Sequence, residues 1–295
     1  MTVNTMSLKI VVLAKQVPDT RNVGKDAMKA DGTINRAVLP AIFNPEDLNA
    51  LEQALRIKDA HPGSTVTVLT MGPGRAADII REGLFRGADG GYLLTDRAFA
   101  GADTLATSYA LSMAIRKIKD FDLIIGGRQA IDGDTAQVGP QVAEKLGITQ
   151  VTYAEEIQKV ENGRATVKRR IDGGVEVVEA PLPLVVTVNG SAAPCRPRNA
   201  RLVQKYKHAK TITEKQQGAT DYIGLCDKRD YLNLAEWSVA DVNGDLAQCG
   251  LAGSPTKVKT VENIVFQAKE NKTISASDTE VEDLVKELLA NHTIG

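Results

Sequence analysis

Three stretches decide the fold class: Lys9–Ala14 (KIVVLA), Thr65–Met71 (TVTVLTM) and Asp122–Gly126 (DLIIG). Each is short, rich in β-branched residues and apolar at almost every position. A strand with one face in water would alternate between apolar and polar residues, so both faces of these strands should be covered by helices. Gly91–Thr95 is a fourth run of this kind. The four runs therefore predict the strands of a parallel sheet.

Helical patterns alternate with these strand runs. Asn44-Pro45 predicts an N-cap followed by proline at the first helical position. A second helix should follow Gly72-Pro73, and a third should lie between Ala102 and Lys119. The alternation predicts an α/β fold with a doubly wound, mostly parallel, Rossmann-like sheet. Three stripes at helical spacing are expected to pack in its core: Leu48, Leu51 and Leu55; Ala77, Ile80 and Leu84; Leu105, Tyr109 and Met113.

After residue 147 the pattern changes to a hairpin. Asp172-Gly173 predicts a two-residue turn, which places Val167 opposite Val178 and Arg169 opposite Glu176. We therefore expect a nucleotide-binding α/β domain over residues 1–200 that includes a hairpin at 164–180.

Residues 201–295 are predicted to form an extended arm and a C-terminal helix that pack on a partner subunit. The arm is polar, weakly periodic and without a strong strand run up to about Lys272. Ser277 and Glu280 predict a capping box for the last helix. Its apolar stripe consists of Val281, Leu284, Val285 and Leu288. A long irregular segment with an isolated helix indicates a surface outside the chain on which it docks.

Composition excludes several classes of function. Lys+Arg 36 against Asp+Glu 37, with 4% aromatic residues, gives no basic or stacking surface for nucleic acid. No run approaches the roughly 18 apolar residues of a transmembrane helix, and Met1–Ser7 lacks a secretory pattern, so we expect a cytoplasmic protein. Three cysteines and three histidines are too scattered for a metal site.

Candidate ligand-binding residues lie where the predicted strands end, because ligands of open α/β sheets bind at that edge. The segments are Leu13–Asp19, Met71–Gly74 and Gly126–Pro140. In the third segment, Asp134 and Gln137 are expected to cap a helix whose N-terminus could receive a pyrophosphate, with Arg128 as a cation. Carboxylates repel phosphate, so Asp132 and Asp134 are assigned to backbone N–H groups or ribose hydroxyls. A turn and cap without a ligand fits the residues equally well.

Two other functions remain open at this stage. Gly72–Ala77 matches the G-x-G-x-x-A fingerprint, and Asp96 follows about 20 residues later, as in NAD-dependent dehydrogenases. Proline between the glycines fits a helix start better. A non-redox ATP-binding module on a similar fold is the other alternative. Nucleophile–base motifs of hydrolases are absent from the sequence.

The sequence resembles the electron-transfer flavoprotein beta subunits at its most specific stretch, Val167–Val178 (VKRRIDGGVEVV), followed by Leu182–Thr187 (LPLVVT). Further matches in the same order are Lys15–Asp19, Asn44–Asp47, Met71–Pro73, Gly127–Asp132 and, more loosely, Gly253–Lys257. The resemblance implies an adenine-nucleotide-hydrolase-like domain and a C-terminal arm that embraces the alpha subunit. It also places the partner-recognition loop at Asn189–Lys207. In this loop, Gly190–Ala193 and Cys195–Pro197 differ from the residues usual in the family.

The resemblance further implies an adenine nucleotide. Respiratory members hold AMP as a structural ligand, whereas a related branch holds a second FAD that takes hydride from NADH. In that branch one electron goes through the alpha-subunit FAD to an acyl-CoA-type or other flavin dehydrogenase, and the other goes to ferredoxin or flavodoxin. Gly133 and Ala136 depart from the AMP pattern and leave room for a longer dinucleotide. We therefore expect FAD and the electron-bifurcating branch, with AMP as the alternative.

The expected cofactor-binding set is Leu13, Ala14, Lys15, Val17, Asp19, Asn44, Met71, Gly126, Gly127, Arg128, Gln129, Ala130, Asp132, Gly133, Asp134, Thr135, Ala136, Gln137, Val138, Gly139 and Pro140. No catalytic side chain and no metal ligand is expected, since the protein's part is to bind, orient and tune the flavin.

Overall fold

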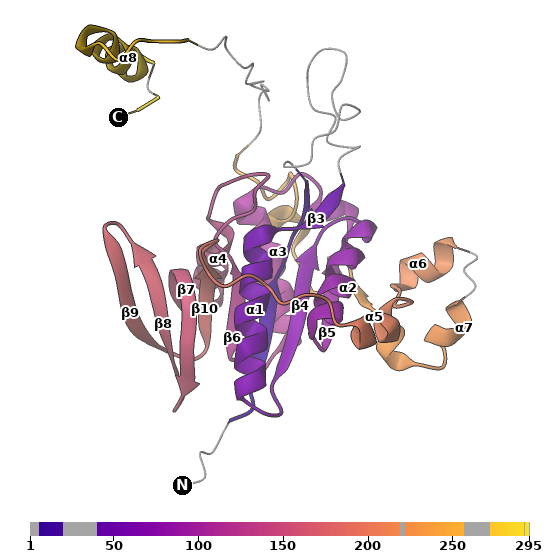
Figure 1. The fold of residues 1–295 in the computed structure, drawn as a ribbon. Coiled ribbons are helices and arrows are strands. Elements are labelled where there is room, and N and C mark those ends of the chain that lie inside the picture. Colours follow the sequence, from indigo (N-terminus) through magenta and orange to yellow (C-terminus); the bar gives the residue numbers. More distant parts are fainter. Residues whose placement is uncertain (1–5, 20–39, 219–221, 257–271, 292, 295) are drawn as a thin grey trace.

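The computed structural model describes residues 6–19, 40–218, 222–256, 272–291 and 293–294 (Figure 1). In this part of the chain nine strands form one sheet in the order β11-β5-β4-β1-β6-β10-β7-β8-β9. The pairs from β11 to β7 are parallel, and β7, β8 and β9 are antiparallel. A short antiparallel ribbon, β2 with β3, lies apart from it. The strands span Lys9–Leu13 (β1), Gln16–Pro18 (β2), Ala41–Phe43 (β3), Thr65–Met71 (β4), Gly90–Leu94 (β5), Leu123–Gly127 (β6), Thr149–Glu161 (β7), Arg164–Ile171 (β8), Gly174–Pro181 (β9), Leu184–Val188 (β10) and Ala235–Trp237 (β11).

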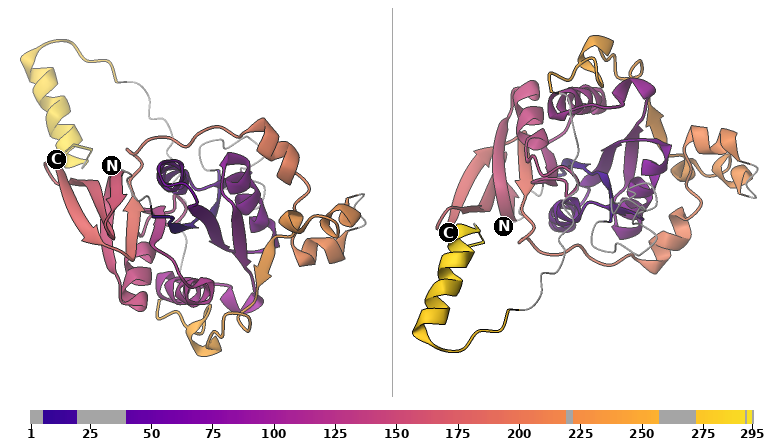
Figure 2. Two further views of the ribbon diagram at one scale, coloured as in Figure 1. Left: turned by 90° about the horizontal axis from the view of Figure 1, so that it is seen from below. Right: turned by 90° about the horizontal axis from the view of Figure 1, so that it is seen from above.

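Helices cover both faces of the parallel part of the sheet, as Figure 2 shows from below and above. Side chains of β1 alternate between two apolar clusters. Ile10 and Val12 pack with helices α1 and α2, and Val11 and Leu13 pack with α3 and α4. The doubly wound α/β fold predicted from the strand runs is confirmed. The helices span Pro45–Ala60 (α1), Ala77–Arg86 (α2), Thr104–Ile118 (α3) and Val138–Leu146 (α4), with short 3-10 turns at Gly74–Ala76 (η2), Arg97–Phe99 (η3), Asp230–Leu232 (η4) and Leu246–Gln248 (η5).

The core stripes of α1 and α2 are where the sequence predicts them. Leu51 and Leu55 are buried, Leu48 is partly buried, and the α2 stripe is buried throughout. The stripe predicted for α3 is confirmed only in part: Leu105 is 40% exposed, whereas Tyr109 and Met113 are partly buried and pack against the second apolar cluster. The residues of α3 that face the sheet are mainly small: Ala106, Ala110, Leu111, Ala114 and Ile115.

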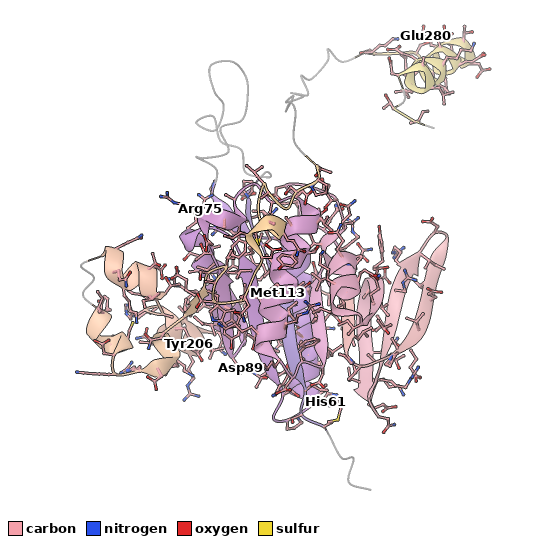
Figure 3. The ribbon with its side chains drawn as sticks, turned by 180° about the vertical axis from the view of Figure 1, so that it is seen from behind. His61, Arg75, Asp89, Met113, Tyr206 and Glu280 are labelled. Carbon is pink, nitrogen blue, oxygen red and sulfur yellow. The ribbon has the colours of Figure 1, made fainter. Side chains whose placement is uncertain are left out.

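The side of α3 with the larger residues lies under the C-terminal segment instead of the sheet. Tyr109 Oη accepts a hydrogen bond from Asp245 N at 2.9 Å. Figure 3 shows Met113 on this back face of the molecule. A search for large apolar residues at helical spacing selected this face, because most of the buried residues of α3 are small.

The predicted hairpin is confirmed in position and register. Strands β8 and β9 flank the turn, Val167 is paired with Val178, and Arg169 is paired with Glu176. The Arg169 guanidinium forms an ion pair with Glu176 at 2.6 Å and donates to the Thr152 carbonyl at 2.8 Å. Arg169 thus joins three strands of the antiparallel extension.

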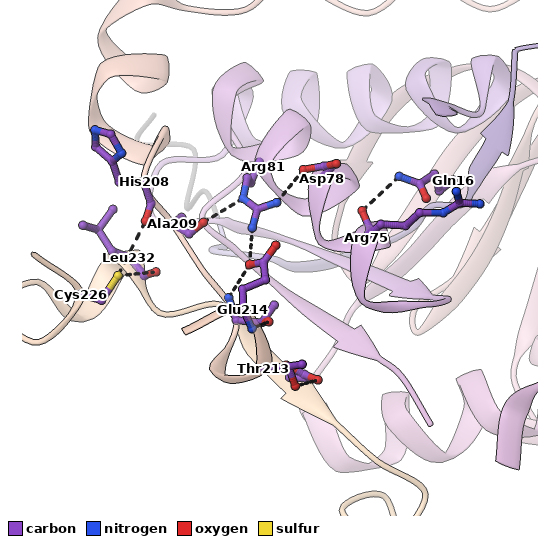
Figure 4. Close-up of polar contacts among 12 residues, drawn as sticks. Gln16, Arg75, Asp78, Arg81, His208, Ala209, Thr213, Glu214, Cys226 and Leu232 are labelled. Atoms are coloured by element: carbon purple, nitrogen blue, oxygen red, sulfur yellow. Dashed lines mark hydrogen bonds and ion pairs between the residues drawn. The ribbon is translucent and has the colours of Figure 1, made fainter. Parts of the chain in front are cut away.

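Residues 200–218 and 222–256 include contacts with α2 and a strand that joins the sheet. Arg81 of α2 donates to the Ala209 carbonyl at 2.8 Å and forms ion pairs with Asp78 and Glu214 (Figure 4). Strand β11 pairs with β5, and Trp237 stacks on Tyr92 with ring centroids 4.0 Å apart. No strand was expected here, because three residues are too few to show a period. The division of the chain at residue 200 stays a prediction. The helices of this segment span Ala200–Tyr206 (α5), Ile212–Gln217 (α6) and Ile223–Cys226 (α7).

Helix α8 (Asp278–Ala290) stands away from the sheet in Figures 1 and 3. Ser277 Oγ accepts from Glu280 N at 3.4 Å, but the Glu280 carboxylate accepts from Ser275 N at 2.5 Å, so only half of the expected capping box forms. None of its residues is buried, and Val281 and Val285 are each more than 40% exposed. In the described part of the chain, no helix is both long and apolar enough to span a membrane.

Candidate functional site

A cavity of about 740 Å³ opens at the carboxyl ends of the parallel strands. Its floor includes Leu13 of β1 and Gly126 of β6, which are paired in the sheet. This is the topological switch point of the sheet: β4, the next strand of the sheet in the sequence, lies on one side of β1, and β6 lies on the other side. Ligands of open α/β sheets bind at such a point. Leu69 and Met71 of β4 and Val185 of β10 complete a mainly apolar floor.

The first turn of α1 holds the floor strands together. Asp47 is buried, and its carboxylate accepts from Lys15 N at 2.8 Å and from Gly127 N at 2.9 Å. These donors follow β1 and end β6, so a single side chain joins the two strands at the switch point. Desolvation raises the pKa of Asp47 to about 7, although the N–H groups of Lys15 and Gly127 act in the opposite direction.

Two neighbours of Asp47 fix the loop that follows β6. Glu46 accepts from Gln129 N at 3.0 Å, and Asn44 both donates to the Gln129 carbonyl at 2.9 Å and accepts from Ile131 N at 3.2 Å. Asn44 is the N-cap residue of α1, as expected, but its side chain makes no cap. Its side chain forms hydrogen bonds with the loop instead, and Asn44 does not line the cavity.

Arg128 points to the cavity rim and is not a free cation. Its guanidinium forms an ion pair with Glu46 at 3.0 Å and lies 5.5 Å from the Tyr153 ring. The hydrogen bond that Arg128 donates to Glu46, only partly offset by desolvation, raises the pKa of Arg128. Arg128 Nε is buried without a hydrogen-bond partner among the described residues.

Two glycines of the site are required by close approach. A Cβ at Gly127 would lie 2.4 Å from Asp47 Oδ1, and one at Gly139 would lie 2.4 Å from Thr187 Cγ2. Gly133 differs, because a Cβ there would meet nothing within 4 Å. The first two glycines bring α1 and α4 against the strands, and the third leaves open space at the loop.

The loop between β6 and α4 is shaped by side chains and by left-handed backbone. Asp134 and Ala136 have φ of 48° and 53°. Asp134 accepts from Gln129 Nε2 at 2.8 Å, and Asp132 accepts from Lys15 Nζ at 2.7 Å. We predicted backbone N–H groups or ribose hydroxyls as partners of these two carboxylates; in the structure their partners are the Lys15 and Gln129 side chains. Both therefore brace the loop.

The predicted cap of α4 is wrong. Helix α4 begins at Val138, and Gln137 occupies the N-cap position without a side-chain cap. Gln137 Oε1 accepts from Thr104 Oγ1 at 2.8 Å, which links the start of α4 to the start of α3. The first N–H groups of α4 are thus not taken by the side chains that were expected to cap them.

Most of the predicted set lines the cavity, and some members do not. Val17 is buried in the β2–β3 ribbon, where it is paired with Ile42. The cavity is lined by Leu13, Ala14, Lys15, Met71, Gly126, Gly127, Arg128, Gln129, Ala130, Gly133, Asp134, Thr135, Ala136, Gln137, Val138 and Gly139, but not by Val17, Asp19, Asn44, Asp132 or Pro140.

Sequence reasoning missed a whole wall of the cavity. It comes from the segment before α3 and from the first turns of that helix, with a further residue, Thr256, from the C-terminal segment. The only sequence signal for this wall was Asp103, which is the N-cap of a helix that follows a strand. The missed lining residues are Asp47, Leu69, Phe99, Gly101, Ala102, Asp103, Thr104, Thr107, Leu111, Val185, Thr187 and Thr256.

No described group of three or more His, Cys, Asp or Glu side chains is arranged to hold a metal ion. Cys226 and Cys249 are buried free thiols, and Cys195 is a partly buried one. Burial raises the pKa of Cys195 to about 11, so this thiol is protonated near neutral pH.

Fold and cavity together define an α/β protein that offers a ligand site at the carboxyl ends of its strands. The family description "Electron transfer flavoprotein domain" matches residues 31–217. The electron transfer flavoprotein subunit beta of Megasphaera elsdenii is 45% identical over 260 residues, which cover 86% of this chain and 87% of that protein. The chain belongs to the electron transfer flavoprotein family, on the side of its beta subunits, as the sequence predicted.

Other relatives carry more specific names. The caffeyl-CoA reductase-Etf complex subunit CarD of Acetobacterium woodii is 44% identical over 252 residues, covering 85% of this chain and 86% of that protein. Protein FixA of Azorhizobium caulinodans is 41% identical over 284 residues, which cover 92% of this chain and 90% of that protein. The similarity to each extends over nearly the whole length of both proteins.

Proposed function

We propose that this chain is the beta subunit of a heterodimeric electron transfer flavoprotein and holds FAD in the cavity at the β1–β6 switch point. The observation that carries the proposal is the cavity itself. Its volume of about 740 Å³ is in the upper part of the roughly 300 to 1,000 Å³ typical of ligand sites. It extends from the apolar floor to the open space beside Gly133. The alternative ligand is AMP, which is shorter.

The residues present fit an adenine dinucleotide. Gly127 and Gly139 let the walls approach where a Cβ would overlap Asp47 or Thr187. The start of α4 lines the cavity and offers N–H groups to a pyrophosphate. Arg128 lines the cavity and supplies a cation beside it. The carboxylates of Asp132 and Asp134 are engaged by Lys15 and Gln129, which reduces their repulsion toward phosphate.

When bound, FAD would accept hydride from NADH and pass one electron toward the alpha-subunit FAD and an acyl-CoA-type dehydrogenase and the other to ferredoxin or flavodoxin. The chain's part is to bind the ligand, orient it and exclude water over the apolar floor. The names of two relatives support the dehydrogenase partner: one belongs to a caffeyl-CoA reductase-Etf complex, and another is an acryloyl-CoA reductase electron transfer subunit. NADH and ferredoxin or flavodoxin follow from the resemblance described above.

The alpha subunit is the proposed partner of the C-terminal part. Helix α8 has no buried residue in this chain, and Val281, Val285 and Leu289 are all more than 40% exposed. Burying such a stripe on a second chain would remove apolar surface from water and stabilise the pair. An isolated helix of this length is only marginally stable in water, which also favours a docked state.

The test is the nucleotide content of the purified heterodimer after denaturation. Two FAD per dimer and no AMP would support FAD in this cavity. One FAD and one AMP would refute FAD here and leave the beta-subunit assignment intact. Reduction by NADH, followed in the visible spectrum, then tests the proposed donor.

The same spectrum separates the two remaining alternatives. A colourless protein that binds ATP would indicate the non-redox module. The dehydrogenase alternative rests on the fingerprint at Gly72–Ala77, none of whose residues lines the cavity. Asp96, its expected ribose ligand, accepts from Ala98 N at 3.0 Å and from Val239 N at 3.1 Å. These bonds give Asp96 a structural role at η3.

A further inference from the structure

One carboxylate joins two distant segments at the rim of the cavity. Asp103 Oδ1 accepts from Leu105 N at 2.9 Å and from Ala106 N at 3.0 Å, which caps α3. Asp103 Oδ2 accepts from Thr256 N at 3.1 Å and from Thr256 Oγ1 at 2.7 Å. Desolvation opposes ionisation, but these four hydrogen bonds hold the pKa of Asp103 below its usual range. The group is therefore a carboxylate near neutral pH.

The segment that carries Thr256 packs closely against the residues before α3. Asp103 N donates to Ser254 Oγ at 2.8 Å, and the buried Ser254 donates to the Gly250 carbonyl at 2.7 Å. A Cβ at Gly250 would lie 2.2 Å from the Ala98 carbonyl oxygen. Gly250 also has a φ of 52°, which favours glycine. The junction therefore has a specific built geometry.

This junction positions a wall of the cavity. Asp103, Thr104 and Thr107 line the cavity on the side of α3, and Thr256 lines it beside them. Across the opening, Thr104 Oγ1 donates to Gln137 at the start of α4. A shift of the α3 start would therefore be transmitted to both sides of the cavity mouth.

We propose that Thr256 is a positioning residue for the ligand of this cavity, because its hydroxyl fixes the wall through Asp103. The inference rests on the proposed function only in that a nucleotide occupies the cavity, and it holds for FAD and AMP alike. Thr256 itself is exposed, so its hydroxyl contributes little to burial of apolar surface. Its effect should appear in how fast the ligand leaves.

The test compares Thr256→Val, which removes the hydroxyl at similar volume, with Thr256→Ser, which keeps it. The full-length chain is purified with its partner subunit. Release of FAD is followed by the rise of its fluorescence after dilution, and release of AMP by chromatography of the filtrate. We expect Thr256→Val to raise the release rate on the order of tenfold, as for one hydrogen bond to a charged group, and Thr256→Ser to stay within about twofold of wild type.

A merely structural role would not produce this pattern. Thr256→Val should also lower the urea midpoint of the nucleotide-free protein, because the same hydrogen bond is lost there, but the association rate should be the same for the three proteins. Equal release rates for wild type and Thr256→Val, or equally fast release from the Val and Ser variants, would overturn the proposal. If Thr256→Val expresses poorly, Thr256→Ala gives the same comparison with Thr256→Ser.

The outcome is separable from that of the proposed function. A wild-type protein that holds AMP in the cavity would refute the FAD assignment, and the release comparison would proceed with AMP. A wild-type protein that retains neither FAD nor AMP would refute both proposals.

Discussion

Replacing Gly127 by alanine should disrupt the junction between α1 and β6. An ideal Cβ at this position lies 2.4 Å from Asp47 Oδ1, 2.8 Å from Asp47 N and 2.8 Å from the carbonyl carbon of Glu46. Two of these three atoms belong to the backbone at the start of α1, so rotation of a side chain cannot relieve the contact. Either the strand end or the helix must move.

The size of the effect follows from two contributions. Overpacking of this kind costs about 1 to 3 kcal/mol. Movement also weakens the hydrogen bond from Gly127 N to the Asp47 carboxylate, and bonds to charged groups contribute about 1.5 to 3 kcal/mol. We therefore expect Gly127→Ala to lower the free energy of unfolding by roughly 3 to 5 kcal/mol. Nucleotide retention should fall with it, because Gly127 lines the cavity.

Urea unfolding followed by circular dichroism measures this change, and Gly133→Ala is the matched control. Both glycines line the cavity, but a Cβ at Gly133 meets nothing within 4 Å. The control should change the free energy of unfolding by no more than about 0.5 kcal/mol. Equal effects of the two substitutions, or a loss below about 1 kcal/mol for Gly127→Ala, would show that the contact with Asp47 does not constrain residue 127.

Three further predictions concern the same cavity. Arg128→Ala should weaken nucleotide retention by about 1 to 3 kcal/mol, measured as the dissociation constant, because a cation that lines the cavity and forms an ion pair with Glu46 is lost; unchanged affinity would remove Arg128 from the site. Gly133→Asn combined with Ala136→Asn should exclude FAD and still admit AMP, so the denatured heterodimer should release one FAD and one AMP; two FAD would contradict the steric argument. Asp47 has a pKa raised by burial from 3.8 to about 7, so between these values the folded state keeps a proton that the unfolded state has lost, and stability falls as pH rises through this window. Asp47→Asn should abolish that part of the pH dependence in unfolding curves, and identical slopes would refute the assignment.

The sheet and its ligand edge could be predicted because parallel strands buried on both faces leave a local pattern. Runs such as Thr65–Met71 coincide with β4 residue for residue. The Asp172-Gly173 turn fixed the hairpin register for the same reason, since the turn type dictates which residues are paired. In both cases the information lies within about ten adjacent residues.

The rest of the site depends on contacts between distant residues. In the sequence, Asp47 is simply an acidic residue in the first turn of a predicted helix, and a negative charge there stabilises any helix. Its bonds to residues 15 and 127 have no sequence signal. The same holds for Asp103, which reads as a simple N-cap although half of its hydrogen bonds go to Thr256. The wall formed by the start of α3 was missed because Thr104 and Thr107, which line it, are polar and give no apolar periodicity.

The position of Thr256 in the chain has a consequence for biosynthesis. The carboxylate that receives its hydrogen bonds is 153 residues earlier in the sequence. A ribosome has therefore made most of the polypeptide before that wall of the cavity can close. Strand β11, at residues 235–237, likewise reaches the sheet edge late. A nascent chain therefore cannot assemble the complete cavity until residue 256 has left the ribosome.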